Sequence, residues 1–104
     1  MSDVKIPFME RWKDAMLSGQ KTCTSRVKQC AREGDTFRVF GATFKIMGVQ
    51  KTTLRVVAAY YYQREGCAAP IDFQLVWVKL HPRRGWEPGR EVWVHFFGRE
   101  YDNT

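Results

Sequence analysis

Two stretches with the apolar spacing of a helix, each opened by a proline, most constrain how this chain can fold. A proline suits the first position of a helix, where no backbone N–H donor is needed. We expect one helix over residues 7–17 and a second over residues 70–80, because apolar residues recur in both at intervals of three and four. The second helix should end at His81, since a residue that precedes a proline avoids helical dihedral angles.

The segments between and after these helices have the composition of β-strands. We expect strands over residues 22–27, 54–62 and 91–97, a hairpin over 36–49, and a loose polar tail from about residue 98. This order is typical of an α+β fold, a small and mostly antiparallel β-barrel with two or more peripheral helices. Side chains fill the interior of so small a barrel, so a binding site should lie in a cleft at its mouth.

Composition limits the class of protein further. A chain of 104 residues, 44% of them hydrophobic, can form one domain with its own core, and we expect a single domain over 1–104. The net charge of +6 favours polyanionic partners, nucleic acid first. The charged N-terminal segment lacks the apolar core of a signal peptide, and no apolar run is long enough to span a bilayer. We therefore expect a cytoplasmic protein without membrane contact.

The sequence shows no motif for a metal or a cofactor. Cys23, Cys30 and Cys67 form no C-x-x-C pair, and His81 and His95 have no acidic partners at ligand spacing. Glycine-rich phosphate loops and the G-x-S-x-G nucleophile motif are also missing. We expect neither a metal ion nor a cofactor.

The stretch LSGQKTCTSR, residues 17–26, holds the first candidate site. Alternate residues of a strand share a face, which places Thr24 and Arg26 on one side and Ser25 on the other, with Lys21 at the preceding turn. Together a lysine, a threonine and an arginine could hold an anion or polarise a carbonyl, and a partly desolvated lysine could activate a hydroxyl. The alternative is a polar strand whose lysine caps the helix C-terminus, and spacing alone favours it.

Three residues later in the chain are further candidates. Glu65, in a loop between a strand and a helix, could orient Lys21 or exchange protons with a substrate, unless it is only a solvated charge. Trp86 lies in a loop with three arginines and could stack on a base while they bind phosphate, or could form a hydrophobic lid. Tyr62 is a further candidate for contact with the substrate.

Several of these segments resemble the ASCH domain family over about residues 5–97. The stretch GQKTCTSR is similar to the family motif G-x-K-x-x-T-x-R, and Gly34-Asp35 and Glu65-Gly66 are further matches. Family members fold as a PUA-like β-barrel, so the resemblance implies that fold for this chain. Some ASCH domains are regarded as RNA-binding modules or ribonucleases, and other small members remove the acetyl group from N4-acetylcytidine.

In those acetyl-removing members, the motif lysine, the motif threonine and a later glutamate form the catalytic set. Carried over, these roles fall on Lys21, Thr24 and Glu65. Lys21 would act as a base on Thr24, whose hydroxyl attacks the amide carbonyl, and Glu65 would position Lys21 or protonate the leaving amine. A variant has water attack with Glu65 as base and Thr24 only orienting. Arg26 and backbone N–H groups could hold the developing oxyanion.

The leading hypothesis is therefore an amidohydrolase that acts on N4-acetylcytidine and related N4-acylcytosines. Its partners would be a modified cytidine nucleoside or RNA, and the protein would be a monomer or a weak homodimer. The candidate substrate-binding residues are Arg26, Ser25, Trp86 and Tyr62. The alternative is an RNA-binding module or ribonuclease that uses the same basic groove.

Overall fold

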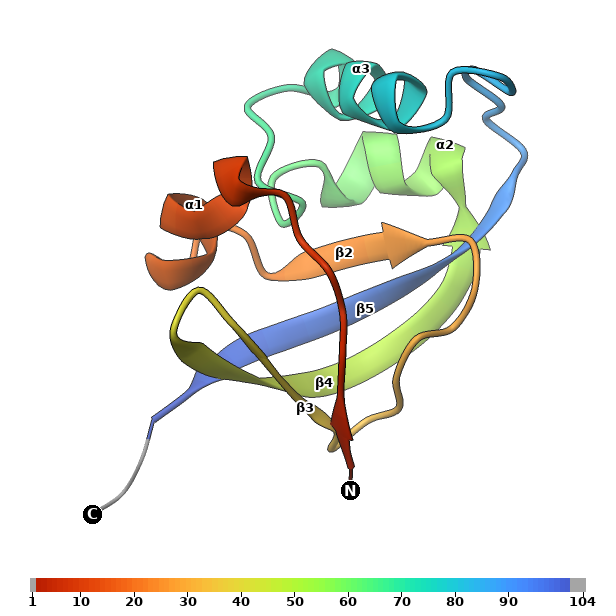
Figure 1. Ribbon diagram of the computed structural model, residues 1–104. Coiled ribbons are helices and arrows are strands. Elements are labelled where there is room, and N and C mark those ends of the chain that lie inside the picture. Colours follow the sequence, from red (N-terminus) through yellow and green to blue (C-terminus); the bar gives the residue numbers. More distant parts are fainter. Residues whose placement is uncertain (1, 102–104) are drawn as a thin grey trace.

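A five-stranded sheet with helices above one end forms the architecture (Figure 1). The computed structural model describes residues 2–101. The strands have the order β1-β3-β4-β5-β2, and every neighbouring pair is antiparallel except β1 and β3. They are β1 (Asp3–Val4), β2 (Cys23–Arg26), β3 (Thr36–Val39), β4 (Ala42–Thr53) and β5 (Glu91–Glu100). The helices are η1 (Glu10–Trp12), α1 (Lys13–Leu17), α2 (Leu54–Val56), the π-helical η2 (Val57–Tyr61) and α3 (Pro70–Leu80).

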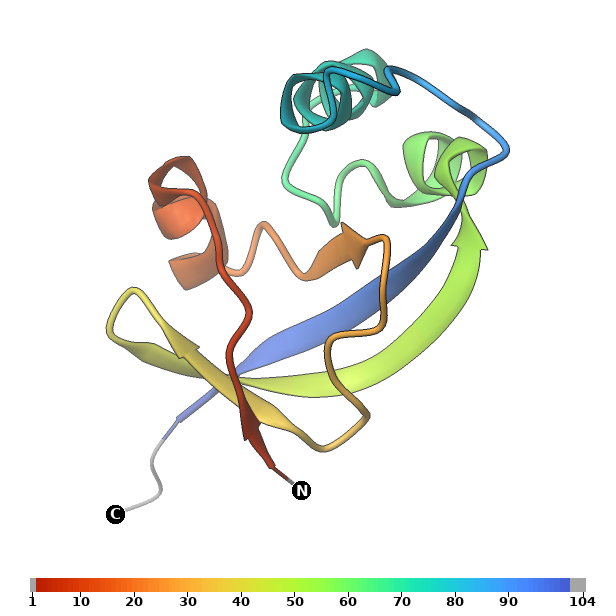
Figure 2. The same cartoon turned by 45° about the vertical axis from the view of Figure 1, so that its right-hand side comes forward.

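The expected α+β class, with a mostly antiparallel sheet and peripheral helices, is confirmed. Figures 1 and 2 show α2 and α3 stacked above β2 at one end, with both termini at the other. The sheet is curled but does not close, because β1 and β2 each have one neighbour among the described residues. One side of β2 is therefore a free edge.

The first of two hydrophobic cores fills the curve of the sheet. A tight turn at Phe40 and Gly41, both with positive φ, joins β3 to β4. The rings of Phe37 and Phe44 stack with centroids 5.3 Å apart, and Phe97 meets both edge-on. Such offset and edge-on contacts are the favoured arrangements of aromatic pairs.

The second core lies between the helices and the other end of β5. α3 has the predicted bounds, with Pro70 in its first turn, and it buries Phe73 and Trp77. These rings pack with Leu54, Val92 and several smaller residues. The site described below lies between the two cores.

The predicted strand over residues 54–62 is wrong, because this segment is helical. Its β-branched and aromatic residues favour a strand by composition. However, Leu54, Val57 and Ala58 are buried together, and a spacing of three and four gives them one helical face. Burial of this face against β5 and α3 outweighs the intrinsic preference of the residues.

Other boundaries differ from the prediction at the chain ends and in the hairpin. The first helix begins at Glu10 rather than at residue 7, and Met9 has an extended backbone. β4 continues to Thr53, beyond the predicted hairpin end. Residues 98–100 are not loose but belong to β5, paired with residues 43–45 of β4. The last part of the expected loose tail, 102–104, lies outside the described residues.

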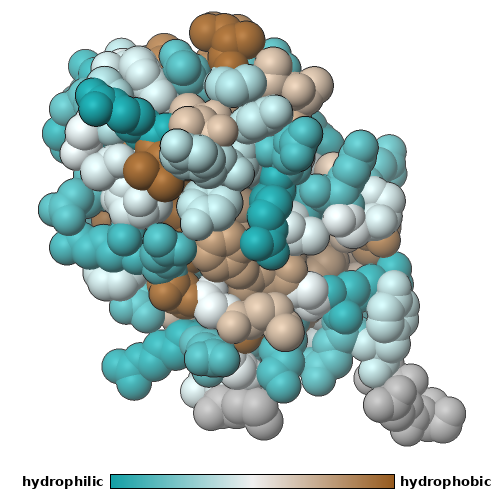
Figure 3. Space-filling view, turned by 180° about the vertical axis from the view of Figure 1, so that it is seen from behind, coloured by the Kyte–Doolittle hydropathy of each residue, from teal (hydrophilic) through white to brown (hydrophobic). Residues whose placement is uncertain are grey.

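Between residues 2 and 101, no helix combines the length and the apolar character needed to cross a membrane. Figure 3 shows the rear face as mainly hydrophilic, with hydrophobic residues confined to smaller areas.

The aromatic cluster predicts a large difference between two substitutions on β4. Phe44→Ala should lower the free energy of unfolding by about 3–5 kcal/mol, because it leaves a cavity between Phe37 and Phe97. Met47 is 61% exposed on the same strand. Met47→Ala should therefore change the free energy of unfolding by no more than about 0.5 kcal/mol. Urea unfolding followed by fluorescence measures both, and equal shifts would contradict this account of the core.

Candidate active site

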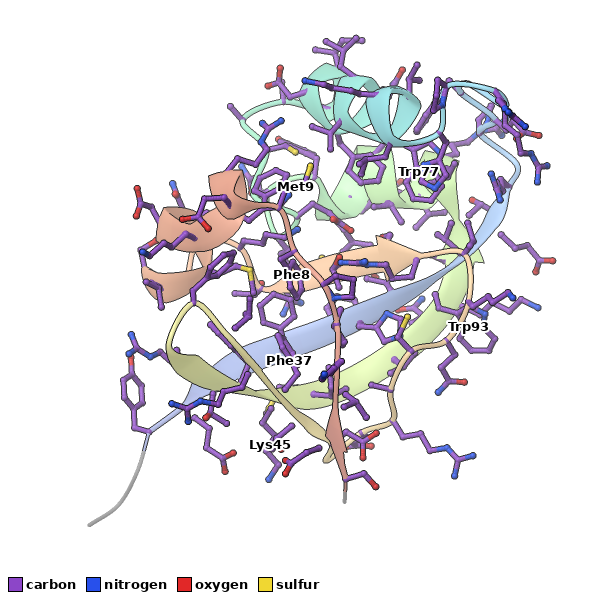
Figure 4. All side chains as sticks on the ribbon, in the orientation of Figure 1. Phe8, Met9, Phe37, Lys45, Trp77 and Trp93 are labelled. Atoms are coloured by element: carbon purple, nitrogen blue, oxygen red, sulfur yellow. The ribbon has the colours of Figure 1, made fainter. Side chains whose placement is uncertain are left out.

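A cavity of about 590 Å³ lies at the free edge of β2. Phe8 and Met9 of the N-terminal segment line one side, and Phe73, Trp77 and Leu80 line the side formed by α3. Figure 4 shows Met9 and Trp77 on opposite sides of the space above β2. Most polar groups of the cavity come from β2 and from the segments next to it, namely Lys21, Thr24, Ser25, Arg26, Lys28 and Glu65, and His81 adds another at the end of α3. Apolar walls with a few convergent polar groups are typical of small-molecule sites.

Lys21 is the central cation of the site and is only 3% exposed. Its ammonium donates to the Glu65 carbonyl at 2.7 Å, the Cys23 carbonyl at 2.9 Å and Glu65 Oε1 at 3.3 Å. It also lies 4.6 Å from the centroid of the Trp12 ring, a cation–π contact. An ammonium has three N–H donors, so these three acceptors use all of them.

Glu65 holds the opposite charge, and both of its carboxylate oxygens have partners. Oε1 forms the ion pair with Lys21, and Oε2 accepts a hydrogen bond of 2.6 Å from the Ser25 hydroxyl. The residue is 5% exposed. Loss of either member of such a buried pair leaves an uncompensated charge, so the two residues stabilise each other. Ser25, which was expected to contact the substrate, thus also orients the carboxylate.

Gly66 allows the chain to turn tightly beside this ion pair. Its φ is +94°, and a Cβ atom there would lie 2.9 Å from the Trp12 ring and 3.3 Å from Lys21 Cβ. The left-handed conformation and the close contact both require glycine. The Glu65-Gly66 pair is therefore a structural unit, in which the glycine lets the carboxylate approach Lys21.

Arg26 joins β2 to the N-terminal segment. Its Nε donates to Thr24 Oγ1 at 3.2 Å, and its Nη2 donates to the Pro7 carbonyl at 2.7 Å. The guanidinium also lies 5.1 Å from the Phe8 ring centroid. Burial lowers the pKa of Arg26. These contacts hold the N-terminal segment against β2 before the first helix begins.

The structure brings Lys21, Thr24 and Glu65 to one cavity. The contacts among them differ from the expected ones, because Lys21 bonds to Glu65 and no hydrogen bond joins Lys21 to Thr24 in the described chain. The Thr24 hydroxyl accepts from Arg26 and keeps its own proton available for donation.

Trp86 and Tyr62 do not line this cavity. Trp86 meets Phe73 edge-on with centroids 6.2 Å apart, and Tyr62 packs against the second core. Both aromatic rings therefore pack on the second core, outside the cavity.

The arginines of the same loop are partly neutralised. Arg84 and Arg90 both lie near Glu87, with closest N–O distances of 2.7 Å and 3.9 Å. The expected phosphate-binding rim around Trp86 is therefore reduced in charge.

His95 is fully buried on β5 next to β2, and the sequence suggested no role for it beyond that of a metal ligand, which the spacing excluded. Its Nε2 accepts the Cys30 N–H at 2.9 Å, and Nδ1 lies 3.4 Å from the Thr24 carbonyl. An imidazole with a backbone donor on one nitrogen and a carbonyl on the other is neutral. Burial lowers the pKa of His95. Only the pairing of Thr24 with His95 across β2 and β5 places it here.

The surroundings of Cys23 and Cys67 keep both thiols unreactive. Burial, and then the charge of Glu65, raise the pKa of Cys23 and that of Cys67, which lines the cavity. Both are therefore thiols at neutral pH. No group of three or more His, Cys, Asp or Glu side chains that could hold a metal ion occurs within residues 2–101.

Comparison with known proteins shows which solved structures share this fold. No family model matches the chain, and no curated protein matches its sequence. An ASCH domain from Lactobacillus crispatus JV V101 superposes with a TM-score of 0.75 at 14% identity, over 94% of this chain and 78% of that one. This likeness confirms that the chain has the fold of an ASCH domain.

Two further crystal structures have a similar fold. The hypothetical protein PH0355 gives a TM-score of 0.68 at 12% identity, over 95% of this chain and 96% of that one. Protein EF3133 from Enterococcus faecalis V583 gives 0.64 at 15% identity, over 99% of this chain and 84% of that one.

The close contact at Gly66 predicts that Gly66→Ala destabilises the protein. The left-handed φ alone should lower the free energy of unfolding by about 1–3 kcal/mol, with a further loss from displacement of Trp12. Gly98→Ala is the matched control, because no atom lies within 4 Å of its Cβ position. Thermal unfolding compares the two variants, and a Gly66→Ala variant as stable as Gly98→Ala would contradict the described packing.

The neutral state of His95 predicts a pH dependence of stability. Its folded-state pKa lies below its unfolded value of about 6.5, so the unfolded chain binds the proton first as the pH falls. Stability should therefore decrease as the pH is lowered from 7 to 5. Urea unfolding at several pH values measures this slope. A His95→Gln variant should have a smaller slope in this window, and an unchanged slope would contradict the assignment.

Proposed function

We propose that the protein is an amidohydrolase that releases cytidine and a carboxylate from N4-acylated cytidine. One observation carries the proposal, namely the buried Lys21–Glu65 ion pair at a cavity whose size suits one nucleoside. Burial of an ion pair costs free energy, so a buried pair at a cavity is a candidate for function. The ASCH-domain fold and the motif resemblance support the same assignment.

Glu65 is the group best suited to move protons. Its carboxylate lies at the cavity, fixed by Lys21 on one oxygen and by Ser25 on the other. It would accept a proton from a water molecule that attacks the acyl carbonyl carbon. The same proton would then pass to the cytosine N4 as the carbon–nitrogen bond breaks. The products are cytidine and a carboxylic acid, which ionises in solution, so no other reactant is needed.

The cations of the site would stabilise the charge that forms on the acyl oxygen. Lys21 and Arg26 carry two positive charges and Glu65 carries one negative charge, and all three residues line the cavity. The Thr24 hydroxyl can still donate its proton. A fixed positive field and a hydroxyl donor at an oxyanion are worth most where water is excluded.

This arrangement favours water attack over attack by Thr24. A lysine base must be neutral and needs a free lone pair, whereas Lys21 donates to three acceptors as an ammonium does. Thr24 is hydrogen-bonded to Arg26, which cannot accept its proton. We therefore assign Thr24 to orientation of the substrate and Glu65 to proton transfer.

A small ligand also fits the surroundings better than an RNA chain. The cavity is bounded by the N-terminal segment and by α3, and Trp86 and Tyr62 lie outside it. Two of the three arginines near Trp86 pair with Glu87. An electrophoretic shift of short RNA that weakens as salt rises would instead support the RNA-binding alternative.

The test follows the ultraviolet change as N4-acetylcytidine is converted to cytidine. The wild type should turn over, and Glu65→Gln should lower kcat about 10²–10⁴-fold, which is the usual contribution of a general acid–base group. Glu91 is exposed, so Glu91→Gln is a matched control expected to retain activity. Unfolding curves of both variants establish that they are folded. No turnover by the wild type would overturn the proposal, and full activity of Glu65→Gln would overturn the role of Glu65.

A further inference from the structure

The free edge of β2 offers one backbone donor and one backbone acceptor at Ser25, a residue that lines the cavity. In an antiparallel pair, successive residues alternately direct both backbone groups toward the partner strand and away from it. The Phe97 N–H donates to the Thr22 carbonyl at 2.9 Å, so this carbonyl faces β5, whereas the Thr22 N–H, which precedes the strand, donates to the Arg64 carbonyl at 2.7 Å. Residues 24 and 26 then also face β5, and Cys23 and Ser25 face away.

The contacts of Cys23 support this alternation. Its N–H donates to the Arg64 carbonyl at 3.0 Å, and its carbonyl accepts from Lys21 Nζ at 2.9 Å. Both partners lie off the sheet, on the free side of β2. The N–H and C=O of Ser25 have the same direction, two residues further along the edge. Within residues 2–101, no hydrogen bond from outside the sheet reaches either group.

Ser25 is buried and lines the cavity. A backbone N–H and C=O removed from water without partners are costly, so a ligand that pairs with both is favoured. The edge is too short for an added strand, because Arg64 and Lys21 already occupy the Cys23 groups. One residue offers one donor beside one acceptor, which suits a small planar ring rather than a peptide ladder.

We propose that the Ser25 backbone reads the Watson–Crick edge of the cytosine ring, with its N–H donating to N3 and its C=O accepting from N4–H. The identity of the ring rests on the proposed function. The N3 acceptor and the N4–H donor are neighbours on cytosine, and together they complement the Ser25 pair.

This pairing would also place the reacting nitrogen beside its acid. The Ser25 hydroxyl is 2.6 Å from Glu65 Oε2, so the backbone that holds N4 belongs to the residue that orients the carboxylate. The Cys23 carbonyl that binds Lys21 lies about 7 Å along the same edge, at about 3.3 Å per residue. The edge of β2 thus positions the base relative to both charges.

Calorimetry with cytidine and 3-deazacytidine tests the pairing, because the second compound replaces N3 with C–H. The wild type should bind 3-deazacytidine about tenfold more weakly, the size of one lost hydrogen bond. Ser25→Ala removes only the hydroxyl and should keep this ratio. Ser25→Pro also removes the N–H, which an edge position tolerates, and it should bind both compounds with equal affinity. Equal binding of the two compounds by the wild type, or a ratio that persists in Ser25→Pro, would overturn the pairing.

Amide NMR of the wild type gives a second measurement if Ser25→Pro does not fold. Cytidine should shift the Ser25 amide proton downfield, and 3-deazacytidine should not. The same shift with both compounds would overturn the pairing. Since cytidine is the product, these measurements do not depend on turnover. If cytidine binds more tightly than 3-deazacytidine but N4-acetylcytidine is not hydrolysed, only the proposed function is overturned. If N4-acetylcytidine is hydrolysed but the two nucleosides bind equally, only this inference is overturned.

Discussion

The rest of the site depends on the buried ammonium of Lys21. Its three donors join the start of β2 to the turn that contains Glu65, and its contact with Trp12 adds the N-terminal helices. Three segments distant in sequence therefore meet at one charge. Because a buried cation needs a compensating anion, the same constraint fixes Glu65 at the cavity. Gly66 then follows, since only glycine fits between that turn and Trp12.

The two cores hold the cavity open between them. The aromatic cluster beneath β3 and β4 fixes the N-terminal segment through Phe8, while Phe73 and Trp77 fix α3. β2 lies between these packed parts and, within residues 2–101, pairs only with β5. The other edge of β2 therefore borders the cavity. Side chains and backbone groups of Cys23–Arg26 both contribute to the site there. A site on a strand between two packed layers is held more precisely than one on a loop.

Much of this arrangement could be predicted from the local pattern. Pro70 and the apolar spacing after it give α3 its bounds, and the strand period places Thr24 and Ser25 on opposite faces. The prediction of a strand over residues 54–62 failed because residues with a strand-like composition form a buried helical face there. The role of Ser25 was only partly foreseen, since its bond to Glu65 joins residues forty positions apart. His95 gave no signal for the same reason, because its partner Cys30 is 65 positions away.

The sequence by itself determined the α+β class and the position of α3, and its resemblance to the ASCH domain family singled out Lys21, Thr24 and Glu65. The class and the helix follow from periodicity and proline chemistry, which act over a few neighbours. Only the tertiary structure decided which acceptors hold Lys21, that Trp86 and Tyr62 lie outside the cavity, and that one edge of β2 is unpaired. Those outcomes depend on strand order and on packing between distant segments. Local sequence does not determine them, because the free energy of a contact is set by both of its partners.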